Sequence, residues 1–286
     1  MKTLVVTADD AGLHPGMNLG ILKAHDEGIV TAASVSPNGR AFDHAVALLK
    51  ERPNLDAGVH FTLVGEHPLS PPEKVSSLLG KDGALLPGFP AFVRRAFLGK
   101  IRGDEVEREL RAQIERLQGT GLRVVHANSH QHLHVLPSLF ETVCKLADEY
   151  RIPWLRVPAD PAASRGLSFR HLELGALNAL GRRARSRIPS SLRATDRAIG
   201  IVAAGHLTPE KLTRILADVQ GTTELVCHPG IGGADLGAQY GWGYGWDAET
   251  AALCDPGVKR SLERAGVRVT AFPGAQNSPR GPLLFP

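Results

Sequence analysis

The sequence has few cysteines, few aromatic residues, little net charge and no long apolar run, and each shortage excludes a class of protein. Its 3 cysteines form no Cys-x-x-Cys pair, so we predict small buried hydrophobes in a reducing compartment. Aromatic content of 5% and a net charge of +4 argue against a nucleic-acid partner. No apolar run approaches the roughly 20 residues that span a bilayer, and no signal peptide is recognisable. We therefore expect a cytoplasmic protein without a transmembrane segment.

What is present is a repeated alternation of short β-rich runs with longer helical patterns. At 286 residues and 43% hydrophobic, with no linker composition inside it, the chain is predicted to form one α/β domain over residues 1–286. Strands are predicted near 3–8, 31–36, 55–61, 123–127, 153–157, 199–203, 223–227 and 267–271. Helices are predicted near 17–27, 40–51, 104–118, 137–150, 208–219 and 255–265. About eight βα units favour a closed or partly closed (β/α) barrel. An open dinucleotide-binding sheet is disfavoured because the GxGxxG fingerprint is absent.

Two segments interrupt this rhythm. Residues 64–103 contain several prolines and glycines, and we expect an insertion folded over the rim of the barrel. Residues 165–197 contain eight arginines against Glu173 and Asp196. This segment is interpreted either as a solvated helical insertion or as a binding surface for an anionic ligand or membrane.

Three apolar runs end in polar side chains that bind metals: Leu4 to Asp10, Ala57 to His60, and Val124 to His132. Separate parallel strands deliver such residues to one rim of a sheet. One carboxylate and two imidazoles leave coordination positions open, as a catalytic metal requires. The pattern therefore predicts metal-assisted hydrolysis.

Asp9 and Asp10 are adjacent, so on a regular strand they would point to opposite faces. At a strand end the backbone can turn both toward one rim, where one carboxylate binds the metal and the other takes a proton from the metal-bound water. Adjacent acids at this place also occur as a simple turn or helix cap. His60, which ends a strand interrupted by Gly58, is by itself more typical of a satisfied core or rim residue.

Four histidines follow the next strand at spacings i, i+4, i+6 and i+8, just before Pro137 opens a predicted helix; they are His126, His130, His132 and His134. At least one is expected to bind a metal, while the others position substrate, move protons or bond to the backbone. A further histidine, His228, ends the strand from Glu224 and precedes a Pro-Gly turn. His228 is a candidate acid that protonates a leaving group. Alternatively, it bonds to a loop carbonyl.

Taken together, the motifs resemble those of the YdjC-like carbohydrate deacetylases, also called the ChbG/HpnK family. Four motifs occur in the family's order, and together they extend over nearly the whole chain: Thr7 to Gly12, Gly58 to Phe61, Asn128 to His134, and Cys227 to Gly230. The resemblance implies a distorted TIM-like (β/α) barrel related to polysaccharide deacetylases. It also implies removal of an acetyl group from an N-acetylated sugar.

The resemblance also implies a role for each site residue. Asp10, His60 and His130 would bind the divalent metal, Asp9 would be the general base and His228 the acid. Contacts with the sugar substrate are expected from His132, His134 and Arg156.

This chain departs from the family pattern at two positions. Ala11 stands where the family has Phe, which removes an aromatic from the rim. Asn128 stands where the family has Asp, and an amide accepts a hydrogen bond but brings no charge, so a weaker hold on the metal is expected.

The donor set suits Zn²⁺, Co²⁺ or Ni²⁺, and Mg²⁺ prefers a shell richer in oxygen. Two other functions use the same residues. One is a non-haem Fe(II) oxygenase, which has the same two-histidine, one-carboxylate set. The other is a non-catalytic sugar-binding protein on the same barrel, in which the catalytic site has decayed. A homodimer is the default expectation for an enzyme of this size.

Overall fold

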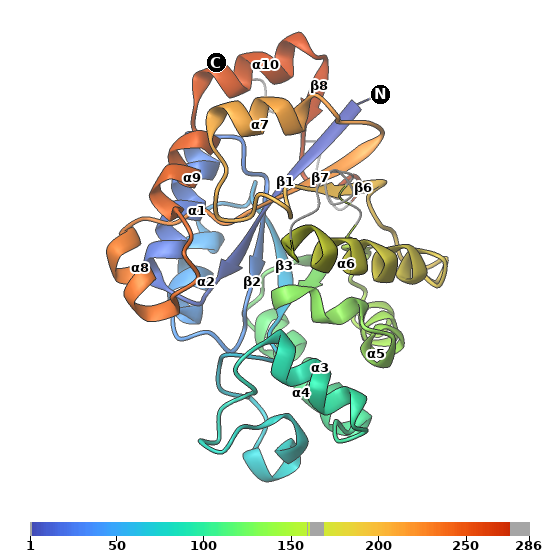
Figure 1. Cartoon of the computed structure of the whole chain (residues 1–286). Coiled ribbons are helices and arrows are strands. Elements are labelled where there is room, and N and C mark those ends of the chain that lie inside the picture. Colours follow the sequence, from blue (N-terminus) through green and yellow to red (C-terminus); the bar gives the residue numbers. More distant parts are fainter. Residues whose placement is uncertain (1, 159, 161–168, 275–286) are drawn as a thin grey trace.

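Eight parallel strands form one sheet in the computed structural model, which describes residues 2–158, 160 and 169–274 (Figure 1). The strands are β1 (Lys2–Ala11), β2 (Ala32–Val35), β3 (Asp56–Phe61), β4 (Val124–Ser129), β5 (Trp154–Leu155), β6 (Arg197–Ile199), β7 (Thr222–Cys227) and β8 (Val267–Val269). Their order is β5-β4-β3-β2-β1-β7-β6, and β8 pairs with the first residues of β1. Seven of the predicted strands overlap an observed strand by two or more residues, whereas the strand predicted at 199–203 shares only Ile199 with β6, which begins earlier at Arg197.

The sheet curls into a barrel. Its two edges are connected by backbone hydrogen bonds of Arg193, which lies four residues before β6. Its backbone N–H donates to the Pro153 carbonyl and its carbonyl accepts from Leu155 N–H, both at 2.8 Å. These bonds connect the β6 side of the sheet to β5. The predicted (β/α)-barrel class is therefore confirmed as a distorted, curled parallel sheet.

Within the described residues, ten α-helices surround the sheet on several sides (Figure 1). They are α1 (Pro15–Asp26), α2 (Phe42–Lys50), α3 (Phe89–Phe97), α4 (Gly103–Gln118), α5 (Pro137–Glu149), α6 (Phe169–Arg185), α7 (Pro209–Leu216), α8 (Gly233–Tyr240), α9 (Trp246–Leu253) and α10 (Pro256–Arg264). Helices α1, α5, α7 and α10 begin at a proline, where the missing N–H would be unsatisfied in any residue. The sequence predicts α1, α2, α4, α5, α7 and α10, but not α3, α8 or α9.

Side chains alternate along β1 between two hydrophobic clusters. Leu4, Val6 and Ala8 belong to the large core that packs between sheet and helices. Val5 belongs instead to a small cluster with residues of other strands, which places it inside the barrel: Ala32, Val125, Trp154 and Phe272. Because the period of a strand is two, Thr7 and Asp9 follow Val5 on the inner side. The barrel interior therefore changes from apolar to polar toward the carboxyl end of β1.

Gly58 of β3 makes room for an imidazole in this interior. A Cβ atom at position 58 would lie 2.2 Å from Cε1 of His126, and that ring stacks on Phe272 with centroids 4.7 Å apart. The glycine that interrupts the predicted strand is thus explained by close packing against His126.

The segment 64–103 contains α3 and two short 3-10 helices, η1 (Pro72–Lys74) and η2 (Ser76–Leu78). Two buried carboxylates of α4 hold it. Glu109 accepts from Leu69 N–H at 3.0 Å and from Ser70 N–H at 2.9 Å, and Glu105 accepts from Ser77 N–H at 2.6 Å. These charge-assisted bonds fix the irregular backbone against the barrel.

Among the described residues, no helix combines the length and apolar character that a membrane span requires. The three cysteines are free; Cys144 and Cys227 are buried and Cys254 is partly buried.

Candidate active site

The end of β1 turns both of its acidic residues toward the same rim. Asp10 has φ of +68°, a left-handed conformation that few residues other than glycine adopt. The pairing of β1 with β2 shifts register between Ala8 and Ala11, as at a β-bulge. The register shift and the left-handed backbone turn the side chain of Asp10 to the same rim as that of Asp9, as the sequence predicts. Strained backbone of this kind is typical of functional sites.

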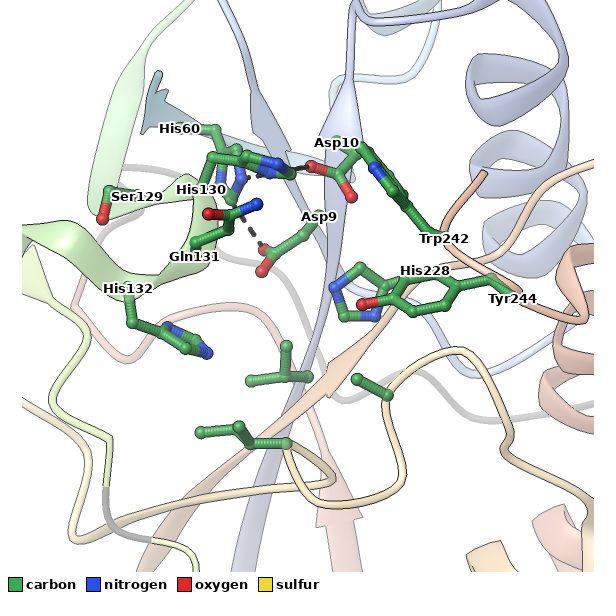
Figure 2. Close-up of a pocket in the computed structure, with 13 residues that line it drawn as sticks. Asp9, Asp10, His60, Ser129, His130, Gln131, His132, His228, Trp242 and Tyr244 are labelled. Carbon is green, nitrogen blue, oxygen red and sulfur yellow. Dashed lines mark hydrogen bonds and ion pairs between the residues drawn. The ribbon is translucent and has the colours of Figure 1, made fainter. Parts of the chain in front are cut away.

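Three side chains from three strand ends meet at this rim (Figure 2). An oxygen of Asp10 lies 3.2 Å from Nε2 of His60 and 3.0 Å from Nδ1 of His130. One donor atom from each residue lies within 4.8 Å of the others. Nε2 of His60 is buried without a hydrogen-bond partner in the described part of the chain, as expected for a metal ligand. The donor set and its geometry fit a divalent metal.

Asn128 fixes the orientation of His60. Its amide nitrogen donates to Ser34 Oγ at 2.8 Å and to Asp9 at 3.2 Å, so its oxygen faces Nδ1 of His60 at 2.7 Å. Nδ1 must then carry the proton, which leaves the Nε2 lone pair directed toward Asp10. An aspartate at position 128 would place a second carboxylate against Asp9. The asparagine therefore keeps the ligand-orienting bond and adds a donor to Asp9.

Asp9 is 3% exposed and is held by a buried cation. Arg156 donates to both Asp9 oxygens, one bond being 2.9 Å, and also to Glu224 at 2.8 Å. Burial alone would raise the pKa of Asp9, but Arg156, His60 and His228 together lower it well below its ordinary value. Asp9 is therefore ionised throughout the neutral range. The predicted substrate contact of Arg156 stays a prediction; its side chain is 1% exposed and forms ion pairs with two carboxylates.

Substitution of Arg156 by methionine is expected to lower the free energy of unfolding by about 3–5 kcal/mol, because Asp9 and Glu224 would then be buried without their cation. Denaturant unfolding followed by circular dichroism measures this. Arg187→Met is the matched control; its partner Glu141 lies 3.4 Å away and both side chains are largely exposed, so the change should stay within about 1 kcal/mol. If Arg156→Met keeps its stability and only raises KM for the sugar, Arg156 is a substrate contact after all.

His228 lies across the cavity from Asp10, His60 and His130, next to Tyr244 (Figure 2). Its backbone N–H donates to Glu249 at 2.6 Å, and its Nδ1 lies 4.0 Å from the same carboxylate oxygen. Nδ1 has no hydrogen-bond partner among residues that the structure describes, so the bond to a loop carbonyl that the sequence left open is not found at this atom. Glu249 is fully buried.

The two remaining histidines of the cluster differ in placement. His132 lines the cavity, whereas His134 is 1% exposed and bonds to Ser129 Oγ at 2.7 Å and to the Arg156 carbonyl at 2.8 Å. Burial lowers the pKa of His134 to about 4, which keeps it neutral. Its predicted substrate contact stays a prediction, while in this structure its ring bonds to the backbone of Arg156. Gln131 and His132 both have left-handed backbone conformations.

A cavity of about 330 Å³ brings the predicted residues together. Asp9, Asp10, His60, His130, His132 and His228 line it. Its other side is apolar and aromatic, from residues that sequence reasoning missed: Ile201, Ala204, Val226, Trp242 and Tyr244. The alternation of aromatic residues with glycine between 240 and 246 is the signal that would have located the last two. Glu249 was missed as a support for His228, because its role depends on a contact distant in sequence.

The Arg-rich segment 165–197 is described only in part. Helix α6 includes residues 169–185 of this segment, and residues 161–168 lie outside the described chain. Arg185 donates to the Thr195 carbonyl at 2.6 Å, while Arg182 and Arg183 are exposed. The described arginines of the segment do not line the cavity. The two interpretations of this segment stay predictions.

Comparison with known proteins gives a match to the family model described as YdjC-like protein over residues 3–264. The chain belongs to the YdjC-like family. The match includes every strand that supplies a residue to the site. The resemblance that the four sequence motifs indicate is thus confirmed.

Several named relatives of this YdjC-like chain are deacetylases. A carbohydrate deacetylase of Geobacillus stearothermophilus is 32% identical over 273 residues, which cover 94% of this chain and 96% of the relative. A chitooligosaccharide deacetylase of Yersinia enterocolitica is 29% identical, with 95% and 98% covered. A carbohydrate deacetylase of Brevibacillus brevis is 42% identical over 150 residues, 52% of this chain and 57% of that protein.

A solved structure shows the same fold for the YdjC-like chain. The crystal structure of an Enterococcus faecalis protein named for cellobiose-phosphate cleavage superimposes with a TM-score of 0.74 at 26% identity, covering 94% of this chain and 97% of that one.

Proposed function

We propose that this protein is a metal-dependent deacetylase that removes the acetyl group from an N-acetylated amino sugar in a saccharide, glycan or glycolipid. One observation carries the proposal: a candidate metal-binding trio (Asp10, His60 and His130), a second ionised carboxylate (Asp9) and His228 line one cavity. Hydrolysis of an amide needs these three elements, namely an electrophile, a base and an acid. Deacetylase relatives that align over nearly the whole chain support the same reaction.

Asp10, His60 and His130 would hold the divalent metal. When bound, the ion would polarise the acetyl carbonyl and lower the pKa of a coordinated water toward neutrality. Zn²⁺, Co²⁺ and Ni²⁺ match two imidazoles and one carboxylate, and Mg²⁺ stays a fourth option.

Asp9 would take the proton of the attacking water. The carboxylate is ionised because Arg156 stabilises its charge, and the same two bonds fix its direction. Arg156 is thus a positioning residue that acts through Asp9. A low pKa makes Asp9 a weak base, so its contribution depends on its position and on a water that is already acidified.

His228 would donate a proton to the nitrogen of the departing amine. Glu249 holds the backbone of His228, and its carboxylate lies 4.0 Å from Nδ1 of the ring. The apolar side chains of Ile201, Ala204 and Val226 on the same cavity would receive the acetyl methyl group, which has no polar partner to satisfy. His132 stays a proposed substrate contact on this side.

The experiment is a screen of N-acetylated saccharides for acetate release, using protein stripped with a chelator and then reloaded with each divalent metal. We expect release only after reloading. A reloaded enzyme that releases acetate from none of the sugars would overturn the proposal. The Fe(II) oxygenase alternative would instead show oxygen uptake after anaerobic iron loading, and a sugar-binding protein would bind the saccharides without turnover.

Cytoplasmic location and a homodimer stay predictions alongside this function. Sedimentation of the purified chain tests the second of these.

A further inference from the structure

The two histidines of the candidate metal site are supported in different ways. Nδ1 of His60 is oriented by the Asn128 oxygen at 2.7 Å. Nδ1 of His130 lies 3.0 Å from Asp10, and the ring has no other hydrogen-bond partner in the part of the chain that the structure describes. A histidine that binds a metal usually donates its second ring N–H to a neighbour that fixes the direction of the ring. Among the described residues, only packing is left to orient His130.

An indole supplies this packing. The ring centroids of Trp242 and His130 are 5.2 Å apart, and the two planes are tilted by 36° (Figure 2). His60 meets the same ring edge-on, with centroids 5.7 Å apart and planes at 71°. Both separations lie within the roughly 4.5–7 Å at which aromatic rings attract each other. The His130 ring therefore contacts two other rings, and its side chain is only 13% exposed.

Residues 240–246, here called the aromatic loop, hold Trp242 in this position. The chain has only three Trp and three Tyr, and four of these six lie in the loop. Tyr240 packs against Trp242 with centroids 4.7 Å apart, and its hydroxyl donates to the Leu13 carbonyl at 2.9 Å. The Leu13 N–H in turn donates to the Asp10 carbonyl at 3.3 Å. The loop is thus fixed to the strand end that supplies the carboxylate of the site.

The contact between Trp242 and His130 would become more favourable with a divalent ion in the site. A coordinated imidazole carries part of the positive charge of the ion. The face of an indole attracts a cation within about 6 Å of the ring centroid, and the 5.2 Å separation meets this condition. An aliphatic side chain of similar size would fill the same space without this attraction.

We propose that Trp242 is a positioning residue for the metal: its indole orients His130 and stabilises the coordinated imidazole, so that the aromatic loop sets the metal affinity of the site. This inference rests on the proposed function, in which Asp10, His60 and His130 hold the ion. Trp242 then does for His130 by ring packing what Asn128 does for His60 by a hydrogen bond. Loss of the indole should weaken metal binding although all three ligands remain.

The test measures Zn²⁺ affinity by competition with a chromophoric chelator, without any sugar. Trp242→Ala should weaken Zn²⁺ binding roughly 10- to 100-fold, the range for loss of a group that orients a metal ligand. Trp242→Phe keeps an aromatic face and should lose less. Trp242→Leu keeps apolar bulk without an aromatic face and should lose more than Trp242→Phe.

Tyr244→Leu is the matched control. Tyr244 belongs to the same loop, and its ring lies 5.2 Å from that of His228, on the other side of the cavity from the trio. Its removal should therefore leave the Zn²⁺ affinity unchanged. Circular dichroism checks the fold of each variant, and the comparison of Trp242→Leu with Trp242→Phe carries the test if Trp242→Ala is unfolded.

Wild-type affinity in Trp242→Leu, or an equal loss in Tyr244→Leu, would overturn the positioning role. Wild type that binds no Zn²⁺ would overturn the metal site, and this role with it. Acetate release is scored separately. Tight Zn²⁺ binding that depends on Trp242, without acetate release from any sugar, would overturn the deacetylase function and support the role of Trp242.

Discussion

Asp10→Asn, His60→Ala and His130→Ala are each expected to abolish stoichiometric metal binding and reduce acetate release to background. Each change removes one of three protein ligands, and the remaining two donors do not hold a divalent ion at the affinity of a catalytic site. Metal analysis of the purified variants by mass spectrometry, beside the acetate assay, measures both effects. His60→Ala should also leave the Asn128 oxygen without its donor.

His132→Ala is the matched control for metal content. This histidine lines the same cavity but lies outside the trio, so its variant should retain a full equivalent of metal. Full occupancy in any of the three ligand variants would show that the residue concerned is not a ligand.

Asp9→Asn is expected to keep the metal and lose roughly 10²–10⁴-fold in turnover, the range for removal of a positioned general base. The asparagine oxygen can still accept from Arg156, so the side chain should stay in place, but it can no longer take a proton. Single-turnover acetate release at saturating sugar, with metal content determined on the same sample, measures the effect.

Comparison with Asp10→Asn makes the Asp9 result decisive. The two residues are adjacent and carry the same group, and only the neighbouring contacts assign one to Arg156 and the other to His60 and His130. Loss of metal in Asp9→Asn with retention in Asp10→Asn would mean that the roles are exchanged.

The pairing of parallel strands explains why much of the site was predictable. The carboxyl ends of neighbouring parallel strands lie at one edge, so polar residues that follow apolar runs converge there whatever the loops do. Asp9, Asp10, His60, His130 and His228 all follow this rule, and the structure places them on one cavity. The eight strands were predictable for the same reason, since buried parallel strands appear as short apolar runs.

Helices α3, α8 and α9 were not predicted, because each has only eight or nine residues and so a short apolar pattern; α3 also contains a proline and α8 two glycines. Helix α8 begins after Gly232 and ends at Gly241, both in left-handed conformations. Helix α9 begins at Trp246, and its buried Glu249 accepts a hydrogen bond from the His228 backbone. Both helices are too short to be recognised from their apolar pattern beside the neighbouring turn residues, so tertiary contacts determine both.

The sequence by itself determined the barrel, the strand ends and the residue types that meet there, because hydrophobic periodicity and chain direction are local properties. Only the tertiary structure decided how the polar residues divide their roles. Arg156 binds Asp9 and Glu224, which are 147 and 68 positions away, and His134 turns inward beside it. Such assignments follow from charge pairing in a buried interior, where each ion must find its partner. Because the partners of a buried ion can lie far apart in sequence, no local sequence pattern predicts these pairs.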